Sequence, residues 1–187
     1  MEKAMIRFIA LCGYPKSGKS EVQRIISQIY GFRAFDDSES LREAAKILYG
    51  LTDWHVSTQE GKSSLVKIGD SRYSVRKVMG DLGCYLEDID EFHFPRRALK
   101  ICAEYPPESR FVFASVRRNQ LSFFKDHGQT LIVEVIRNGC RPLGHFDEYS
   151  RDLVDISIEN CWNHGDTVCS LEHLRNHIAE KLDPLLL

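Results

Sequence analysis

The feature that most constrains the fold is a glycine-containing segment between two apolar stretches near the N-terminus. Residues 5–12 form an apolar run of strand length, and apolar residues recur at helical spacing over residues 19–30. Between them, residues 13–20 read GYPKSGKS and match the pattern G-x-x-x-x-G-K-[ST] at every fixed position. The sequence therefore predicts a strand, a tight loop and a helix in direct succession.

This loop predicts a binding site for the phosphates of ATP. The two glycines let the backbone wrap closely around a phosphate group, and the amide groups at the start of the helix face the anion. A lysine at position 19 reaches the β- and γ-phosphates, and the hydroxyl of Ser20 is a ligand for Mg²⁺. The loop residues expected to bind ATP are Gly13, Lys16, Ser17, Gly18, Lys19 and Ser20.

Strands and helices alternate along the rest of the chain. Further strands are predicted at residues 33–35, 111–115, 130–137 and 155–158. Helices are predicted at residues 41–48, 75–88, 95–104, 120–127 and 171–182. This alternation indicates an α/β fold with a mainly parallel, five-stranded sheet covered by helices on both faces.

The length of 187 residues fits one domain, residues 1–187, with an insertion between the second and third strands. The insertion, at about residues 36–108, is mostly helical and longer than an ordinary crossover. Residues 50–73 are polar and lack a clear period, which predicts a long mobile connection. We expect the insertion to bind the acceptor of the phosphoryl group.

Composition limits the partners. The formal net charge is -2, without the basic excess typical of nucleic-acid-binding proteins, so no nucleic-acid partner is expected. None of the six cysteines forms a C-x-x-C pair, which favours reduced thiols over disulfides. The apolar runs are far shorter than the ~20 residues that span a bilayer, and no targeting segment is visible. We expect a soluble, cytoplasmic protein.

Arginines are placed at the ends of the predicted elements. Transfer of a phosphoryl group between two anions requires cations around the transferred group. A single arginine of this kind is as often a solvated surface residue, but seven at element ends favour an anion site. They are Arg76, Arg96, Arg97, Arg117, Arg118, Arg137 and Arg141.

Beyond the phosphate loop, the sequence resembles the deoxynucleoside monophosphate kinases of tailed phages and their bacterial relatives. The resemblance extends along most of the chain. The matching segments are residues 35–45, 74–83, 111–117, 145–148 and 155–160. It implies the three-layer fold of P-loop NTPases and the P-loop nucleoside monophosphate kinase superfamily, and it suggests a homodimer. If the chain is phage-encoded, the host cytoplasm is its expected location.

The resemblance also implies roles for individual residues. Arg76 would hold the phosphate of the acceptor, and Asp36 or Asp37 would lie near the acceptor or the Mg²⁺ shell. Arg117 would stabilise the transferring phosphoryl group, and Arg137 would belong to the lid over ATP. Lys19, Arg76 and Arg117 are thus the expected catalytic residues.

Two features complete the predicted site. Ser115 stands where the family has an aspartate before Val-Arg, so Mg²⁺ is expected to depend on Ser20 and, through water, on Asp36 or Asp37. The acidic run at residues 87–91 is most simply a solvated helix end; a second interpretation gives Asp90 a contact to the acceptor sugar or base.

The leading functional hypothesis is ATP-dependent phosphorylation of a deoxynucleoside 5′-monophosphate to the diphosphate. One alternative is another small-molecule P-loop kinase, acting on dephospho-coenzyme A or on a nucleoside. A second is a non-catalytic module that binds ATP to regulate a partner, which the serine at position 115 favours. The sequence does not identify the acceptor base.

Overall fold

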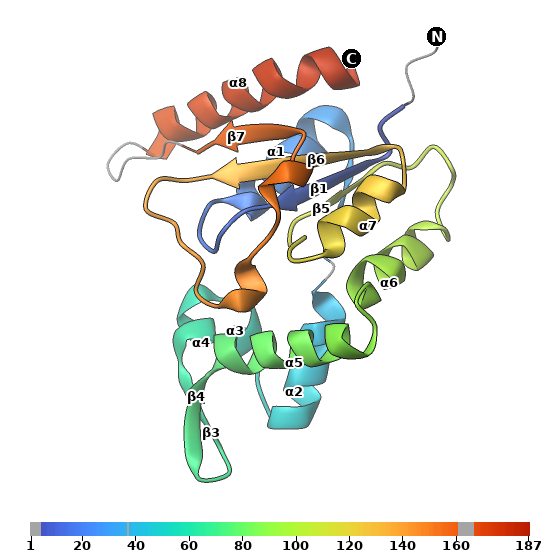
Figure 1. Cartoon of the computed structure of the whole chain (residues 1–187). Helices are drawn as coiled ribbons and strands as arrows, with labels where there is room; N and C mark the ends of the chain where they lie inside the picture. The colour runs from blue at the N-terminus through green and yellow to red at the C-terminus, as the bar shows by residue number, and fades with distance from the viewer. Residues whose placement is uncertain (1–4, 37, 161–166) are drawn as a thin grey trace. The chain divides into compact units, whose positions relative to one another are not determined.

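The computed structural model describes residues 5–36, 38–160 and 167–187, with side chains of the last helix described from residue 171 (Figure 1). The chain divides into two compact units, Met1–Asp37 with Phe94–Leu187, and Ser38–His93. We call the first the sheet unit and the second the insertion unit. The predicted insertion, residues 36–108, contains the whole of the insertion unit.

The sheet unit is built on a five-stranded sheet with the order β2-β5-β1-β6-β7. The strands are β1 (Phe8–Cys12), β2 (Arg33–Phe35), β5 (Phe111–Phe113), β6 (Thr130–Ile136) and β7 (Ile156–Glu159). All of its strand pairings are parallel, and β1 lies in the centre between β5 and β6. The predicted fold class, an α/β fold with a mainly parallel five-stranded sheet, is confirmed.

Helices cover both faces of this sheet because alternate side chains of each strand point to opposite sides. Ile9 and Leu11 of β1 pack with residues of α1 (Lys19–Tyr30) and α8 (Thr167–Leu186). Ala10 and Cys12 pack on the other face with residues of α6 (His93–Cys102) and α7 (Gln120–Asp126). Both faces of β1 are buried, which explains its uninterrupted apolar sequence.

The carboxyl ends of the parallel strands carry the loops that contain the predicted site residues of the sheet unit. The phosphate loop follows β1, and residues 114–119 follow β5. After β6, the chain passes through two short 3-10 helices, η1 (His145–Asp147) and η2 (Arg151–Leu153), before it enters β7. This edge of a parallel sheet is where ligands bind in open α/β folds.

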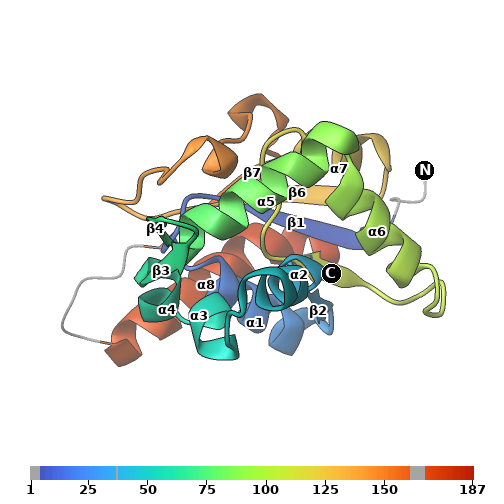
Figure 2. The same ribbon diagram turned by 90° about the horizontal axis from the view of Figure 1, so that it is seen from below.

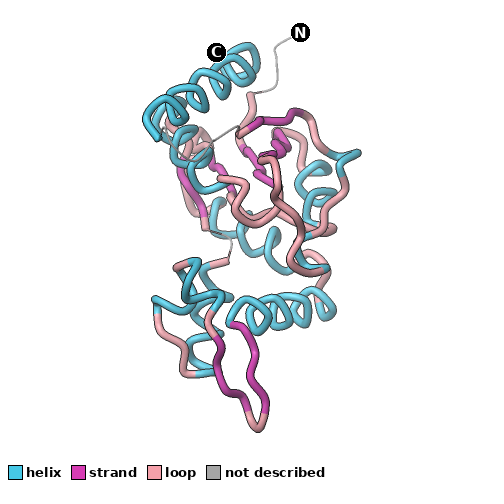
Figure 3. Tube along the Cα trace, turned by 90° about the vertical axis from the view of Figure 1, so that its left-hand side faces the viewer, coloured by secondary structure: helices cyan, strands magenta, loops and turns pink. Residues whose placement is uncertain are grey.

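The insertion unit contains the helices α2 (Glu39–Tyr49), α3 (Asp53–Ser57), α4 (Gln59–Ser63) and α5 (Val75–Ile89). Ala45, Leu51, Val56 and Val75 form its small hydrophobic core. Figure 2 shows α2, α3 and α4 as neighbours, in agreement with the contacts between consecutive helices. The unit also holds the antiparallel hairpin of β3 (Leu65–Ile68) and β4 (Ser71–Ser74), the long magenta hairpin at the bottom of Figure 3.

The prediction of a long mobile connection at residues 50–73 was wrong. Two five-residue helices and most of the hairpin occupy this stretch. Thr52 and Thr58 are the N-cap residues of the two helices, and the Thr58 side chain accepts a hydrogen bond from the amide of Gly61. Gly69, in the left-handed region with φ of 60°, and Asp70 make the two-residue hairpin loop.

The other boundaries differ from the predictions by a few residues. β1 begins at Phe8 rather than at residue 5, and β5 ends at Phe113, so Ser115 lies beyond the strand. Among the helices of the described residues, none is both long and apolar enough to cross a membrane.

Candidate active site at the phosphate loop

Two glycines let the phosphate loop lie close to neighbouring strands. Gly13 has φ of 136°, and a Cβ added there would lie 2.4 Å from the backbone oxygen of Val135 in β6. Gly18 has φ of 100°, and an added Cβ would lie 2.3 Å from the side-chain nitrogen of Asn160, directly after β7. Both positions thus exclude side chains by space as well as by backbone conformation.

The start of α1 offers donors without a side-chain partner. Gly18 is the N-cap residue and provides no side-chain cap to the first amide groups of this twelve-residue helix. Ser17 is 1% exposed, and its hydroxyl oxygen is buried without a hydrogen-bond partner. Buried hydroxyls are nearly always hydrogen-bonded, so this orphan group together with the uncapped start of α1 fits a bound anion.

The side chain of Lys19 folds back onto the phosphate loop. Its Nζ donates to the carbonyl oxygens of Gly13, at 2.6 Å, and Tyr14, at 3.0 Å. Burial, together with the positive charge of Arg117, lowers the pKa of Lys19 to about 8, whereas the charge of Asp147 acts in the opposite direction. An ammonium group that lacks water in this way gains from a phosphate partner.

Two other predicted residues contact or adjoin the loop. The guanidinium of Arg137, directly after β6, donates to the backbone oxygen of Lys16 at 3.4 Å. The side chain of Ser20 is exposed in the first turn of α1. The structure therefore places Arg137 beside the phosphate loop and Ser20 at the end of that loop.

Arg117 and Ser115 lie in the loop after β5. The amide of Val116 donates to the carbonyl oxygen of Leu11 at 3.2 Å, which joins this loop to the strand that leads into the phosphate loop. Nε of Arg117 donates to the carbonyl oxygen of Ser115 at 3.4 Å. Ser115 itself is half-buried.

Asp147 was missed by the sequence analysis. One of its carboxylate oxygens, Oδ1, lies 3.7 Å from Nη1 of Arg117, and its side chain is 8% exposed. The signal in the sequence was weak: an acidic residue in the segment that resembles a family element, without a pattern that pairs it with Arg117.

Glu134 is a second buried carboxylate that the sequence analysis missed. It lies in β6 opposite Cys12 of β1, and it is 4% exposed. It accepts hydrogen bonds from the hydroxyls of Tyr149, at 2.6 Å, and Ser157, at 3.1 Å, and it pairs with Nε of Arg151 at 2.8 Å. The sequence signal was a lone acidic residue inside the apolar run TLIVEVI.

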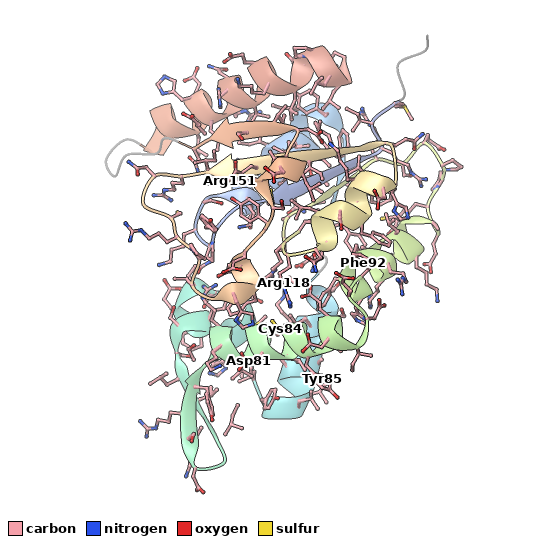
Figure 4. The ribbon with its side chains drawn as sticks, in the orientation of Figure 1. Asp81, Cys84, Tyr85, Phe92, Arg118 and Arg151 are labelled. Carbon is pink, nitrogen blue, oxygen red and sulfur yellow. The ribbon has the colours of Figure 1, made fainter. Side chains whose placement is uncertain are left out.

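This cluster fastens the segment before β7 to the sheet. Arg151 is 61% exposed, so its guanidinium reaches from the buried Glu134 toward solvent (Figure 4). The three donors satisfy both carboxylate oxygens, as a buried charge requires. The cluster supports the segment rather than offering an open binding site.

The remaining predicted residues divide between the two units. Asp36 directly follows β2 in the sheet unit, and Asp37 lies outside the described residues. Arg76 is in the first turn of α5 in the insertion unit, where its Nη2 donates to the side-chain oxygen of Gln59 at 2.8 Å. Asp90 ends the same helix, and its carboxylate accepts from the amide of Phe92 at 3.2 Å.

The described residues include no group of three or more His, Cys, Asp or Glu side chains that could hold a metal ion. A Mg²⁺ ion that arrives with a nucleotide does not need one, because phosphate oxygens and water supply most of its six ligands. The exposed hydroxyl of Ser20, in the same loop as the unpartnered hydroxyl of Ser17, is suited to be one protein ligand of such an ion.

No protein-family model and no curated protein matches this chain. Among solved structures, it is similar to shikimate kinase from Aquifex aeolicus, with 18% identity, 95% and 96% of the two chains covered, and a TM-score of 0.47. It is also similar to dephospho-CoA kinase from Campylobacter jejuni, with 12% identity, 96% of each chain covered, and a TM-score of 0.49. At these values the likenesses carry no argument about activity.

Proposed function

We propose that this protein is a kinase that transfers the γ-phosphate of ATP to a deoxynucleoside 5′-monophosphate. The observation that carries the proposal is the phosphate loop, with the unpartnered hydroxyl of Ser17 and the uncapped start of α1. Its two glycines let the loop pack closely against Val135 and Asn160, and Nζ of Lys19 donates to the carbonyl oxygens of the loop. Helix N-termini of this form bind phosphate groups.

In this proposal, the residues of the sheet unit bind and neutralise the triphosphate. Lys19 leaves the carbonyl oxygens of the loop and pairs with the β- and γ-phosphates, and Arg137 closes over them. Arg117 faces the charge that builds up on the transferring group. Mg²⁺, held by Ser20 and the phosphates, would supply further charge neutralisation. No covalent enzyme intermediate is required.

The choice of acceptor rests on the arginine of α5 and on the sequence resemblance. Arg76 follows Ser74, whose side chain caps the helix by accepting from the amide of Lys77. An arginine fork at this point suits the two oxygens of a monophosphate. Asp36 or Asp37 is proposed to lie near the acceptor or its Mg²⁺ shell, and Asp90 near the acceptor sugar or base. A general base is optional, because the acceptor phosphate is already an anion.

A coupled assay with ATP, Mg²⁺ and each of the four deoxynucleoside monophosphates tests the proposal. We expect turnover with at least one of them and none with a nucleoside or dephospho-coenzyme A. Turnover with a nucleoside or with dephospho-coenzyme A would show that the proposed acceptor is wrong. ATP binding without any turnover would favour a regulatory module.

Variants test whether the turnover belongs to the phosphate loop. Lys19→Ala should lower kcat roughly 10²-fold or more while leaving the fold intact. Lys181→Ala, which removes an exposed lysine of α8, is the matched control and should retain full activity. A folded Lys19→Ala protein with near-normal turnover would contradict the role of the loop.

We also propose that the protein is a homodimer, because the family that the sequence resembles suggests one. Light scattering in solution tests this.

A further inference from the structure

Asp147 is a buried carboxylate in a segment whose neighbours face solvent. It is 7% exposed, and within residues 141–150 it alone is buried. A carboxylate is costly to remove from water unless a cation or hydrogen-bond donors accompany it. A specific interaction must therefore hold it there.

The two oxygens of Asp147 have different partners. Oδ2 accepts a hydrogen bond from the backbone amide of Leu143 at 3.0 Å, which closes the turn before η1. Oδ1 faces the guanidinium of Arg117, with 3.7 Å to Nη1. An asparagine would keep an oxygen for the first interaction but would remove the charge that serves the second. The two interactions can thus be separated by one substitution.

The backbone, rather than a long side chain, brings Asp147 to Arg117. The amide of Arg118 donates to the carbonyl oxygen of Glu148 at 2.6 Å, and Arg118 and Tyr149 form an isolated parallel bridge. Figure 4 shows Arg118 beside the short helix η1. Arg118 has φ of 50°, an uncommon value for a residue with a side chain, so this contact is held in a strained conformation. Tyr149 is held in turn by Glu134.

A hydrogen bond within its own loop also restrains Arg117. Its Nε donates to the carbonyl oxygen of Ser115 at 3.4 Å, while Nη1 faces Asp147. The guanidinium is therefore held at two of its nitrogens. The charges of both side chains shift the pKa of Lys19: Arg117 lowers it and Asp147 raises it. The three charged groups are therefore close enough to interact.

We propose that Asp147 is a positioning residue that holds the guanidinium of Arg117 toward the phosphate loop before a nucleotide binds. The inference rests on the proposed function, in which Arg117 acts on the transferring phosphoryl group. A cation oriented in advance costs less reorganisation during the reaction than one that must be ordered then. Asp147 contributes through Arg117 and needs no contact with the substrate.

The first experiment needs no nucleotide. The solvent exchange rate of the Arg117 Nε–H group is measured by NMR in the wild type, in Asp147→Asn and in Glu148→Gln, which removes an exposed carboxylate one residue away. Exchange should accelerate several-fold in Asp147→Asn and stay unchanged in Glu148→Gln. An unchanged rate in folded Asp147→Asn would overturn the proposal. Asp147→Ser provides the same test if the asparagine variant does not fold.

A double-mutant cycle then connects the contact with catalysis. Asp147→Asn should lower kcat about tenfold in the wild-type background and less than about twofold in an Arg117→Gln background. Equal losses in both backgrounds would show that Asp147 acts independently of Arg117. If the wild type transfers no phosphate, the proposed function fails, whereas the NMR experiment still decides whether Asp147 holds Arg117.

Discussion

The side-chain amide of Asn160 donates a buried hydrogen bond to the backbone oxygen of Ser17, with an N–O distance of 2.9 Å. It joins the end of β7 to the phosphate loop, although the two residues are far apart in the sequence. The same side chain fills the space that a Cβ on Gly18 would occupy. The end of β7 therefore helps to set the shape of the loop.

Replacement of this asparagine should weaken both stability and nucleotide binding. Asn160→Ala leaves the buried oxygen of Ser17 without a donor, so we expect the free energy of unfolding to fall by about 1–3 kcal/mol. ATP affinity should fall as well, because the loop loses an anchor. Urea unfolding and calorimetry measure the two effects. Asn176→Ala, on the exposed face of α8, is the control and should change stability by less than about 0.5 kcal/mol.

Arg76→Ala should act on the acceptor rather than on ATP. If Arg76 clamps the monophosphate, its removal raises the KM for the acceptor and lowers kcat, while the Kd for ATP changes little. The expected loss in kcat/KM is about tenfold to 10²-fold, as for loss of a charge-assisted hydrogen bond. Arg72→Ala, an exposed arginine on β4, is the matched control. If the binding of ATP and the binding of the acceptor were weakened equally, the assignment of Arg76 to the acceptor would be wrong.

Two buried thiols should resist alkylation. Burial and the nearby Glu134 raise the pKa of Cys12 to about 12, and burial raises that of Cys102 to about 11. Because only the thiolate reacts, Cys12 should carry about 10³-fold less reactive thiolate at pH 8 than an ordinary thiol. Cys84 and Cys140 are half-buried and should react with iodoacetamide before Cys12 and Cys102 do, as read by peptide mass spectrometry. Equal rates in the folded protein would contradict this.

The same shifts predict a loss of stability in alkali. The folded-state pKa values of both thiols lie above the ordinary value of 9.0, so the folded protein holds these protons more tightly than the unfolded chain. Their contribution to stability is complete below about pH 9 and is lost as the pH rises through about 11 to 12. Urea unfolding between pH 8 and 11 measures this trend, and Cys102→Ala should reduce it.

The sequence was sufficient for the sheet because the signals there are local and long enough to recognise. β1 is an unbroken apolar strand, and α1 repeats its apolar residues over twelve positions. The helices α3 and α4 are five residues each, too short to show a period, and their caps Thr52 and Thr58 are common in loops as well. That is why residues 50–73 resembled a connection.

The residues of the candidate site also differ in how far the sequence alone identifies them. The loop from Gly13 to Ser20 follows a contiguous pattern, so its residues could be identified without a structure. Asp147 and Glu134 acquire their surroundings from partners distant in sequence, such as Arg117 for the first and Ser157 for the second. Only the sheet topology brings these residues together, and a single sequence does not display it.

Ser115 offers the sharpest test of how the site holds Mg²⁺. The residue is half-buried just beyond β5, with the guanidinium of Arg117 on its carbonyl oxygen. Ser115→Asp should therefore fold, because Arg117, Lys19 and the metal offset the new charge. We expect it to lower the Mg²⁺ concentration for half-maximal activity, and Asp36→Asn to raise it.

The neutral variant Ser115→Asn separates the charge of the new side chain from its size. It should melt at the same temperature as Ser115→Asp and show the Mg²⁺ dependence of the wild type. If position 115 instead packs away from the site, the aspartate would be a buried charge without a partner and would cost about 3–5 kcal/mol of stability. In that case the melting temperature of Ser115→Asp would fall far below that of Ser115→Asn, with the Mg²⁺ dependence unchanged. Such a result would remove Ser115 from the metal site and, with it, the match of residues 111–117 to the family strand.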